Sequence, residues 1–257
     1  MNKKLKVMSF NIRMDTEYDG INRFRNRIGR IKEVIDTENP DIIGFQEVTP
    51  YMRSVLKEVL TDYTLVGCGR GKIYDDESMT IAFKTKDFDI ISLENIWLSE
   101  TPDVPGSKYG YDHSGCPRMF TSVKLKWENS DTPFYIINTH LDHEGDYARY
   151  LESTQLCEYV NKLDYKFILT GDFNAPPEAK EIKIVTESLS DIGCIDCTEN
   201  LGITFHSFLK LPEERYGKID YIFSNEKLIS SYKVPDIMED GKFYSDHNAV
   251  VAILEME

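Results

Sequence analysis

The chain of 257 residues carries 44 acidic and 30 basic side chains, which gives a formal net charge of −14 at pH 7. This acidic balance disfavours a protein that coats long nucleic acid, because such a surface repels a polyanion. The length and the near-average composition predict that residues 1–257 form a single α/β domain with a sizeable core.

Apolar runs rich in β-branched and aromatic residues recur along the whole chain and predict strands. These strands cover residues 5–12, 41–45, 63–67, 79–83, 88–98, 120–127, 134–141, 167–170, 219–223 and 249–254. Apolar residues at i, i+3, i+4 spacing predict helices at residues 23–38, 51–60, 147–163 and 178–188. Asp146 and Pro177 are start signals for the last two helices. Without a regular βαβ repeat, this mixture favours strands stacked in two sheets with helices outside.

The least regular segment, residues 99–117, is rich in Gly and Pro and is predicted to be a long loop. It is either a surface excursion or a wall of a functional site. Two of its aromatic residues, Tyr109 and Tyr111, either stack on a base or pack locally.

Polar residues follow the predicted strands in a recurrent pattern. The clusters are SFN at 9–11, QE at 46–47, NTH at 138–140, GDFN at 171–174, KID at 218–220 and SDH at 245–247. Strand ends that carry polar groups are where α/β scaffolds place function. The six clusters are therefore expected to converge in one cleft.

These residue types suit the hydrolysis of a phosphate ester. Hard oxygen ligands such as Glu47, Asp246 and Asn11 favour magnesium, or manganese, which neutralises charge on phosphoryl oxygens. Asp172 is a candidate base for the attacking water. Asn174 projects the same way from an extended segment and is a candidate to orient the water or the phosphate.

A histidine with a buried carboxylate partner supplies the remaining chemistry. His247 and Asp220 are candidates for such a pair, in which the carboxylate fixes the tautomer of the imidazole. Each cluster alone is a weak signal, since an Asp-His dipeptide is usually a surface turn and G-D-x-N often forms an Asx turn. Their ordered combination behind hydrophobic strands favours an enzyme.

The chain resembles the endonuclease/exonuclease/phosphatase superfamily, the enzymes that are similar to DNase I. The motifs that carry this resemblance are MSFNI at 8–12, GFQEV at 44–48, INTHL at 137–141, LTGDFNAPP at 169–177, KIDYIF at 218–223 and YSDHNAV at 244–250. They span almost the whole chain, and GDFN together with the terminal SDH is highly specific. The resemblance implies a four-layer α/β/β/α sandwich of the DNase I-like type, consistent with the strands and helices above.

The resemblance also implies roles for individual residues. Asn11 and Glu47 match the Asn and Glu beside the metal, and Asp246 matches the other carboxylate on the metal side. Asp172 and Asn174 match the pair that activates and orients water.

Further matches concern the phosphate and the leaving group. Asp220 and His247 match the Asp–His couple that contacts the phosphate, and His140 matches a second histidine that assists the leaving oxygen. Arg118 matches a phosphate-binding arginine of several branches. Glu77 is expected to support His140, on a shorter match.

The segments WLSETPDVPGS at 97–107 and CPR at 116–118 resemble a bacterial branch related to the carbon catabolite repressor deadenylases and nocturnin. The expected function is metal-dependent hydrolysis of a small phosphate ester or a short oligonucleotide. The alternatives are a sphingomyelinase-like lipid phosphodiesterase and a catalytically silent binding platform. The sequence leaves the physiological substrate, the number of metal ions and the oligomeric state open.

Several other features favour ordinary structural roles. Arg23, Arg25, Arg27, Arg30 and Lys32 lie on a predicted amphipathic helix, whose charged face is expected to be solvated. The glycine-rich run at 67–72 lacks the spacing of a phosphate-binding loop and is expected to be a hairpin or surface turn. The remaining histidines are expected in loops or at the surface. They are His113, His143 and His206.

The cysteines predict free thiols rather than a disulfide framework, because five scattered cysteines do not pair evenly. They are Cys68, Cys116, Cys157, Cys194 and Cys197. No stretch approaches the roughly 20 apolar residues of a membrane span, and no signal peptide is recognisable. A cytoplasmic location is therefore expected.

Overall fold

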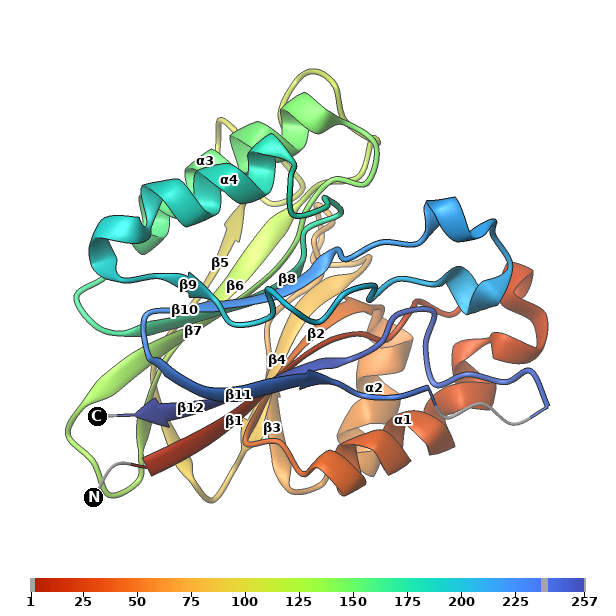
Figure 1. Ribbon diagram of the computed structural model, residues 1–257, viewed down its shortest axis with the longest axis horizontal. Coiled ribbons are helices and arrows are strands. Elements are labelled where there is room, and N and C mark those ends of the chain that lie inside the picture. The colour runs from red at the N-terminus through yellow and green to blue at the C-terminus, as the bar shows by residue number, and fades with distance from the viewer. Residues whose placement is uncertain (1–2, 237–239, 257) are drawn as a thin grey trace.

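The computed structural model describes residues 3–236 and 240–256, which build two sheets packed face to face (Figure 1). In the first sheet the strand order is β11 (Lys227–Lys233), β12 (Val250–Met256), β1 (Lys3–Asn11), β2 (Ile42–Val48), β4 (Ser78–Lys84) and β3 (Tyr63–Val66). In the second sheet it is β5 (Phe88–Trp97), β6 (Met119–Trp127), β7 (Pro133–His140), β8 (Phe167–Asp172), β10 (Asp220–Ser224) and β9 (Ile195–Asp196).

Helices cover the outer face of each sheet. Those against the first sheet are α1 (Phe24–Glu38) and α2 (Pro50–Val59), and those against the second are α3 (Asp146–Val160) and α4 (Lys180–Ser188) (Figure 1). Short 3₁₀ helices occur in the connections, namely η1 (Glu17–Asn22), η2 (Ser190–Ile192), η3 (Ser207–Leu209) and η4 (Glu213–Arg215). The expected four-layer α/β/β/α sandwich is confirmed.

Apolar side chains form three cores, one between the two sheets and one between each sheet and its helices. Successive residues of a strand point to opposite faces, so a single strand contributes to two of these cores. In β1, Leu5 and Val7 face the second sheet, whereas Met8 and Phe10 face α1 and α2. In β2, all seven residues are buried, because this central strand lies between another sheet and a helical layer. Burial on both faces explains why the central strands are continuous apolar runs.

A buried polar network joins the two sheets directly beneath the ends of the strands. Gln46 Nε2 donates to Asn138 Oδ1 at 2.7 Å, and Thr170 Oγ1 donates to the same oxygen at 3.1 Å. Gly44 allows this close approach, since a Cβ there would lie 2.1 Å from Thr170 Oγ1. The polar residues Gln46 and Asn138 thus fasten the sheets together below the cleft.

Two strands and some helix limits differ from the sequence-based expectation. The edge strand β11 has a mixed polar sequence, KLISSYK, without apolar alternation, and it forms because it pairs with β12. The two-residue strand β9 is similarly too short to leave a pattern. Asp146 does begin α3, whereas α4 begins at Lys180, with the extended Ala179 as its N-cap.

The segment between β5 and β6 has neither helix nor strand, so the predicted loop at 99–117 is confirmed. Part of this loop is a surface excursion, since residues near 103 are exposed, and part is a wall, since Cys116 lines the pocket at the strand ends. Among the described residues, every helix is too short or too polar to cross a membrane.

Candidate active site

The strand pairing brings the polar strand ends to one edge of the sandwich. The parallel pair β7 and β8 places His140 opposite Asp172, and the antiparallel pair β8 and β10 places Asp220 opposite the same Asp172. In the other sheet, Asn11 ends β1, and the segment with Asp246 leads directly into β12, which pairs with β1.

These ends line a pocket of about 420 Å³. Eight of the ten residues predicted for the site line it, namely Glu47, Glu77, Arg118, His140, Asp172, Asn174, Asp246 and His247. The other two, Asn11 and Asp220, are buried behind these residues and hydrogen-bond to them. The expected convergence of the clusters is therefore observed, although Gln46 and Asn138 turn away from the pocket.

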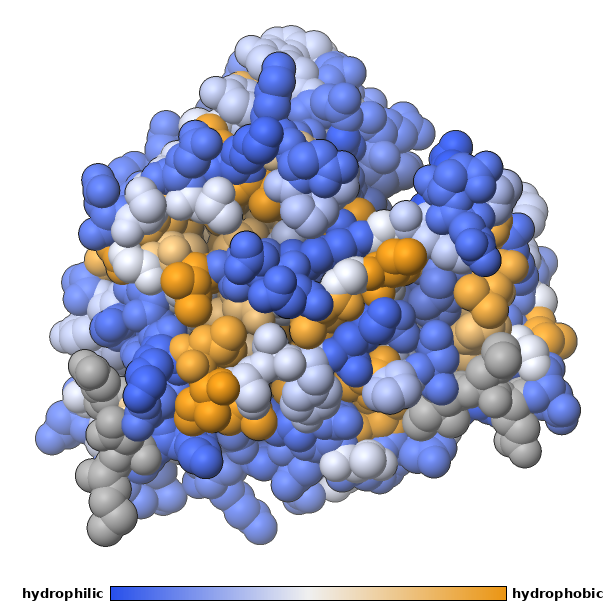
Figure 2. Space-filling model, viewed as in Figure 1, coloured by the Kyte–Doolittle hydropathy of each residue, from blue (hydrophilic) through white to orange (hydrophobic). Residues whose placement is uncertain are grey.

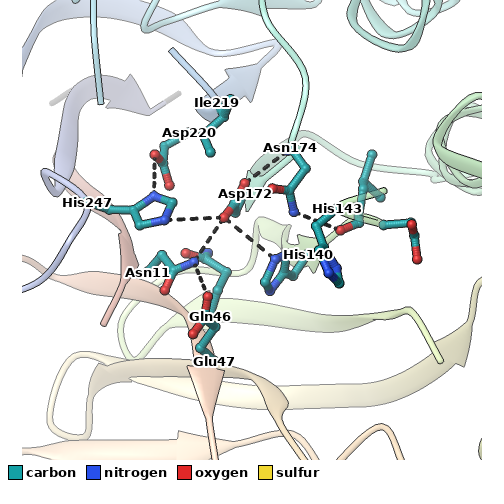
Figure 3. A network of polar contacts seen from close by, with 12 residues as sticks. Asn11, Gln46, Glu47, His140, His143, Asp172, Asn174, Ile219, Asp220 and His247 are labelled. Carbon is teal, nitrogen blue, oxygen red and sulfur yellow. Dashed lines mark hydrogen bonds and ion pairs between the residues drawn. The ribbon is translucent and has the colours of Figure 1, made fainter. Parts of the chain in front are cut away.

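Asp172 is the centre of this network (Figure 3). Its Oδ2 accepts a hydrogen bond from Asn11 Nδ2 at 2.9 Å and lies 3.6 Å from His140 Nε2 and 3.8 Å from His247 Nε2. Its Oδ1 accepts from the backbone N–H of Asn174 at 2.9 Å. Burial and the neighbouring Asp220 carboxylate raise the pKa of Asp172 to about 7.

His247 and Asp220 form the predicted pair, with 2.9 Å between His247 Nδ1 and Asp220 Oδ2. Burial alone would lower the pKa of His247, but the carboxylates of Asp220, Asp172 and Asp246 outweigh it and raise the pKa to about 10. The imidazole is therefore protonated at neutral pH and directs its Nε2–H toward Asp172 (Figure 3).

Glu47 and Asp246 face a common cation. The Arg13 guanidinium lies 3.7 Å from Glu47 Oε2 and 3.7 Å from Asp246 Oδ2. Burial opposes ionisation of Glu47, but Arg13 and the N–H of Met14 hold its pKa below the usual value. Burial raises the pKa of Asp246, and repulsion by Glu47 adds to this.

A local irregularity aims Glu47 into the pocket. The pairing of β2 with β4 shifts register between Phe45 and Val48, and Glu47 adopts a left-handed φ of 64°. Such a φ is uncommon for a residue other than Gly and is often found at functional sites.

Two groups of side chains offer ligands that suit a divalent cation. Glu47, Asp246 and Asn11 supply buried hard oxygens. Arg13 lies close to both carboxylates, so a positive charge is favourable in this part of the pocket. The ligand atoms of a neighbouring group, Asp172, Asp220 and His247, also lie within 4.8 Å of one another, but the protonated imidazole of His247 has no lone pair to offer, so the first group is the better candidate.

The wall opposite these carboxylates is basic. Arg118 Nη2 lies 2.7 Å from His143 Nδ1. The buried Nε and Nη1 of Arg118 have no hydrogen-bond partner among the described residues, although Asp142 Oδ2 lies 3.7 Å from Nε. Buried unpaired N–H groups are costly, so this guanidinium is suited to receive an anion.

His140 is uncharged at neutral pH, because burial, Arg118 and Arg70 lower its pKa well below the ordinary value. Glu77 Oε2 is 4.0 Å from His140 Nδ1, outside hydrogen-bond distance, and is 3.1 Å from Arg70 Nη1. Burial and repulsion by Glu47 raise the pKa of Glu77 to about 7. The expected support of His140 by Glu77 remains a prediction.

Three basic residues that line the pocket were not predicted as site residues, namely Arg13, Arg70 and His143. His143 lies in a loop and is exposed, as expected, and its Nδ1 also contacts Arg118 Nη2 at 2.7 Å. The glycine-rich run is a turn as expected, yet its Arg70 is buried. Arg13 could have been predicted from its position, because it follows Asn11 by two residues at the end of β1 and side chains at this spacing point the same way in an extended segment.

One expectation is wrong because a buried polar group finds partners from distant segments. Arg27 was expected on a solvated face but is fully buried, where it donates to the carbonyls of Ile12 and Tyr244. His206 lies in a loop as expected, but it is buried there, with its Nε2 3.2 Å from Asp236 Oδ1. The free thiols are confirmed for all five cysteines, and His113 lies in a loop as expected.

A sequence profile of the Endonuclease/Exonuclease/phosphatase family matches residues 8–247. The crystal structure of an endonuclease/exonuclease/phosphatase from Bacteroides vulgatus superposes with a TM-score of 0.91 at 27% identity, over 99% of this chain and 100% of that chain.

Two other solved structures extend the likeness. The mannosyl-6-phosphatase of Bacteroides thetaiotaomicron gives a TM-score of 0.85 at 26% identity, covering 97% of this chain and 99% of its own. The catalytic domain of human nocturnin gives 0.73 at 17% identity over 100% and 97% of the two chains, a likeness that shows the fold alone. The sandwich is thus of the DNase I-like type, and the chain belongs to the endonuclease/exonuclease/phosphatase family.

Proposed function

We propose that this protein is a divalent-metal-dependent phosphoesterase, which hydrolyses a small phosphate ester or a short oligonucleotide by attack of an activated water. The observation that carries the proposal is the position of Asp172, whose one carboxylate oxygen lies within 3.8 Å of Asn11, His140 and His247 side-chain nitrogens. A buried carboxylate surrounded by donors in a pocket is a typical catalytic arrangement.

Glu47, Asp246 and Asn11 would hold the cation, for which Mg²⁺ fits best and Mn²⁺ is the alternative. The donor set supports this, since all three side chains are buried and offer hard oxygen atoms. When bound, such a cation neutralises charge on the phosphoryl oxygens.

Asp172 is the proposed base. Its pKa of about 7 leaves a substantial share of the carboxylate ionised at neutral pH, able to accept a proton from the attacking water. Asn174 is held beside it, because its N–H donates to Asp172 and its amide donates to the carbonyl of Leu141 at 3.0 Å. The free amide oxygen of Asn174 is then the group that orients the water.

The remaining groups stabilise the phosphoryl charge and the leaving oxygen. His247, protonated and oriented by Asp220, donates a hydrogen bond to a phosphoryl oxygen, and the unpaired N–H groups of Arg118 bind another. His140 is neutral and offers its ring N–H to the leaving oxygen.

The pocket favours a small substrate. Its volume of about 420 Å³ accommodates a phosphate and one attached group. The net charge of −14 opposes long nucleic acids, whereas Arg70 and Arg118 offer positive charge to a small anion inside the pocket. The mannosyl-6-phosphatase among the similar structures supports inclusion of sugar phosphates among the candidates.

Substitutions at Asp172 and His247 test the assignment. With bis-p-nitrophenyl phosphate and p-nitrophenyl phosphate at saturating Mg²⁺, Asp172→Asn and His247→Ala are each expected to lower kcat by roughly a hundredfold or more. Asp131→Asn, at an exposed position outside the pocket, is the matched control and keeps the wild-type rate. Turnover close to the wild-type rate in both site variants would contradict the proposed catalytic roles of Asp172 and His247.

The same experiment separates an enzyme from a silent binding platform. A platform would show no hydrolysis with Mg²⁺ or Mn²⁺ and no heat of metal binding in calorimetry. A panel of short RNA, short DNA, nucleotides, sugar phosphates and sphingomyelin then ranks the substrate classes by kcat/KM.

A further inference from the structure

Three tyrosines form an exposed stack beside the pocket. Tyr111, in the long loop, stacks on Tyr147 of α3 with 5.8 Å between ring centroids, and Tyr147 stacks on Tyr150 with 6.3 Å between centroids. The planes are nearly parallel, at 25° and 9°. We call these three residues the tyrosine ladder.

The ladder leaves a large aromatic surface in water. Tyr111, Tyr147 and Tyr150 are 49%, 51% and 37% exposed. Their hydroxyl groups donate no hydrogen bond to any other residue in the described ranges, unlike Tyr109, whose hydroxyl is bonded to Gln155. Of the two loop tyrosines, Tyr109 therefore packs locally, while Tyr111 contributes to an open aromatic face.

The ladder is fastened to the walls of the active-site pocket. Asp112 Oδ2 accepts from the N–H of Tyr147 at 2.8 Å. Gly145 lets the loop approach this closely, because a Cβ there would lie 1.6 Å from the Asp112 carbonyl oxygen. The Asp142 carboxylate ties both segments by accepting from the N–H groups of Ser114 and Gly145.

Both segments continue into the pocket. The loop runs from the ladder through Ser114 to Cys116 and Arg118, and the other segment leads back from Tyr147 to His143. In Figure 1 the loop before β6 lies against the start of α3, and in Figure 2 the surface is indented between this region and the segment around η4.

A second cavity adjoins the ladder. It has a volume of about 700 Å³ and is lined by Tyr147, Tyr150 and Pro176, the last of which stands two positions after Asn174 of the active-site pocket. Its two buried charged residues, Arg149 and Glu181, bond to each other at 3.0 Å and demand no external ion. The exposed rim of the cavity carries Asp146, Glu178 and Lys180, and its aromatic surface comes from Tyr147 and Tyr150.

The role proposed for His140 indicates which part of a substrate would contact the tyrosine ladder. His140 is assigned to the leaving oxygen, and the chain passes from His140 directly along His143 to Tyr147. We place the organic group attached to the leaving oxygen on the side of the pocket lined by His140 and His143, from which the chain continues to Tyr147. This step rests on the function proposed above.

We propose that the tyrosine ladder binds the nucleobase of a nucleotide or of the terminal residue of a short single strand. A base presents a flat π face that stacks on tyrosine with little dependence on its identity. The rim charges nearly balance, because Arg149 pairs with Asp146 and Lys180 stands near Glu178, so the rim offers no extended basic track for the phosphates of a long strand.

Tyr147→Ala tests this proposal with three substrates, namely adenosine monophosphate, glycerol phosphate and mannose 6-phosphate. The expected result is a five- to hundredfold rise in KM for adenosine monophosphate with no change for the other two, since only the nucleotide carries a base. Tyr147→Phe keeps the ring and is expected to keep the wild-type KM. Tyr111→Ala, at an independent exposed position, is expected to show a smaller change of the same kind.

An unchanged KM for adenosine monophosphate overturns the proposal, as does an equal loss for glycerol phosphate or a loss confined to mannose 6-phosphate. Calorimetric titration with adenosine monophosphate separates this inference from the proposed function. Binding that weakens in Tyr147→Ala, in a protein that hydrolyses none of the three esters, supports the ladder and contradicts the phosphoesterase. If Tyr147→Ala hydrolyses all three esters and binds adenosine monophosphate as tightly as wild type, the role of the tyrosine ladder is contradicted and the proposed phosphoesterase function is not.

Discussion

Arg13 holds a position that the proposed mechanism gives to a metal ion. Its guanidinium lies between Glu47 and Asp246 and is anchored by Asp19, whose Oδ2 is 3.0 Å from Arg13 Nε. Removal of a cation from two buried carboxylates is unfavourable, so Arg13 stabilises the site while no metal is bound. A divalent cation that enters must share these carboxylates with a permanent positive charge.

Arg13→Gln is therefore expected to tighten Mg²⁺ binding by about tenfold, because it removes a positive charge close to both carboxylates. Calorimetric titration of the metal-stripped protein measures the change. Arg25→Gln, which removes a mostly exposed arginine paired with Asp15, is the control with unchanged affinity. Weaker Mg²⁺ binding in Arg13→Gln would show that the arginine organises the site rather than competes with the metal.

At the residue scale, sequence reasoning identified groups that follow strands in recognisable motifs. Asp172 and His247 belong to such motifs, and their convergence follows from strand order. Arg70 and His143 lie in irregular connections, where the conformation depends on distant segments, so no periodic pattern places them in the pocket. Arg27 illustrates the same limit, since its carbonyl partners come from Ile12 and Tyr244, far apart in the chain.

At the element scale, α3 links the two halves of the site. Its residue Glu152 accepts a hydrogen bond from the N–H of Asp142 at 2.8 Å, and Asp142 in turn holds the loop that leads to Arg118. Burial raises the pKa of Glu152 to about 7. Glu152 therefore keeps its proton to a higher pH in the folded protein than in the unfolded chain.

This shift makes the stability of the fold depend on pH. The folded state holds a proton on Glu152 that the unfolded chain loses near pH 4.5, so the stabilisation is complete below that pH and is lost as pH rises to about 7. Glu152→Gln keeps the acceptor without the charge. Relative to wild type it is expected to raise the free energy of unfolding by about 2 kcal/mol at pH 8 and to leave it nearly unchanged at pH 4.5.

Denaturant unfolding at both pH values measures this difference. Glu144→Gln, at an exposed position nearby, is the control with no difference at either pH. A Glu152→Gln variant that is less stable than wild type at pH 8 would mean that the ionised carboxylate is the form that holds the loop.

Elements with strong periodicity were predictable, whereas irregular ones were not. The apolar runs predicted β1 and β2 because these strands are buried on both faces. Polar β11 forms only through its partner β12, and the register shift that aims Glu47 depends on the pairing of β2 with β4. Tertiary pairing, which no local pattern contains, determines both.

At the scale of the whole molecule, we propose that residues 1–257 form one domain. The support is the apolar layer between the sheets, to which both contribute, as in the packing of Val7 and Ile42 with Ile136 and Ile222. Each sheet needs the other to shield its apolar inner face from water. Thermal unfolding monitored by calorimetry is expected to show a single transition, and two separated transitions would contradict the proposal.

The pocket holds charges of both signs, although the molecule as a whole is acidic. The net charge of the chain is −14, and the pocket is lined by Arg13, Arg70 and Arg118 as well as by Glu47, Glu77, Asp172 and Asp246. A small anionic ester is attracted to the arginines, whereas a long polyanion meets the acidic surroundings. This contrast agrees with a small substrate.

The central claim is metal-dependent phosphoester hydrolysis in this pocket. The most direct measurement is the initial rate of p-nitrophenol release from bis-p-nitrophenyl phosphate by metal-stripped protein, as Mg²⁺ is added back. The account predicts negligible hydrolysis without metal and a saturable increase with Mg²⁺, with the saturation point displaced to higher concentration in Glu47→Gln. A rate that is independent of added metal, or no hydrolysis with either Mg²⁺ or Mn²⁺, would contradict it.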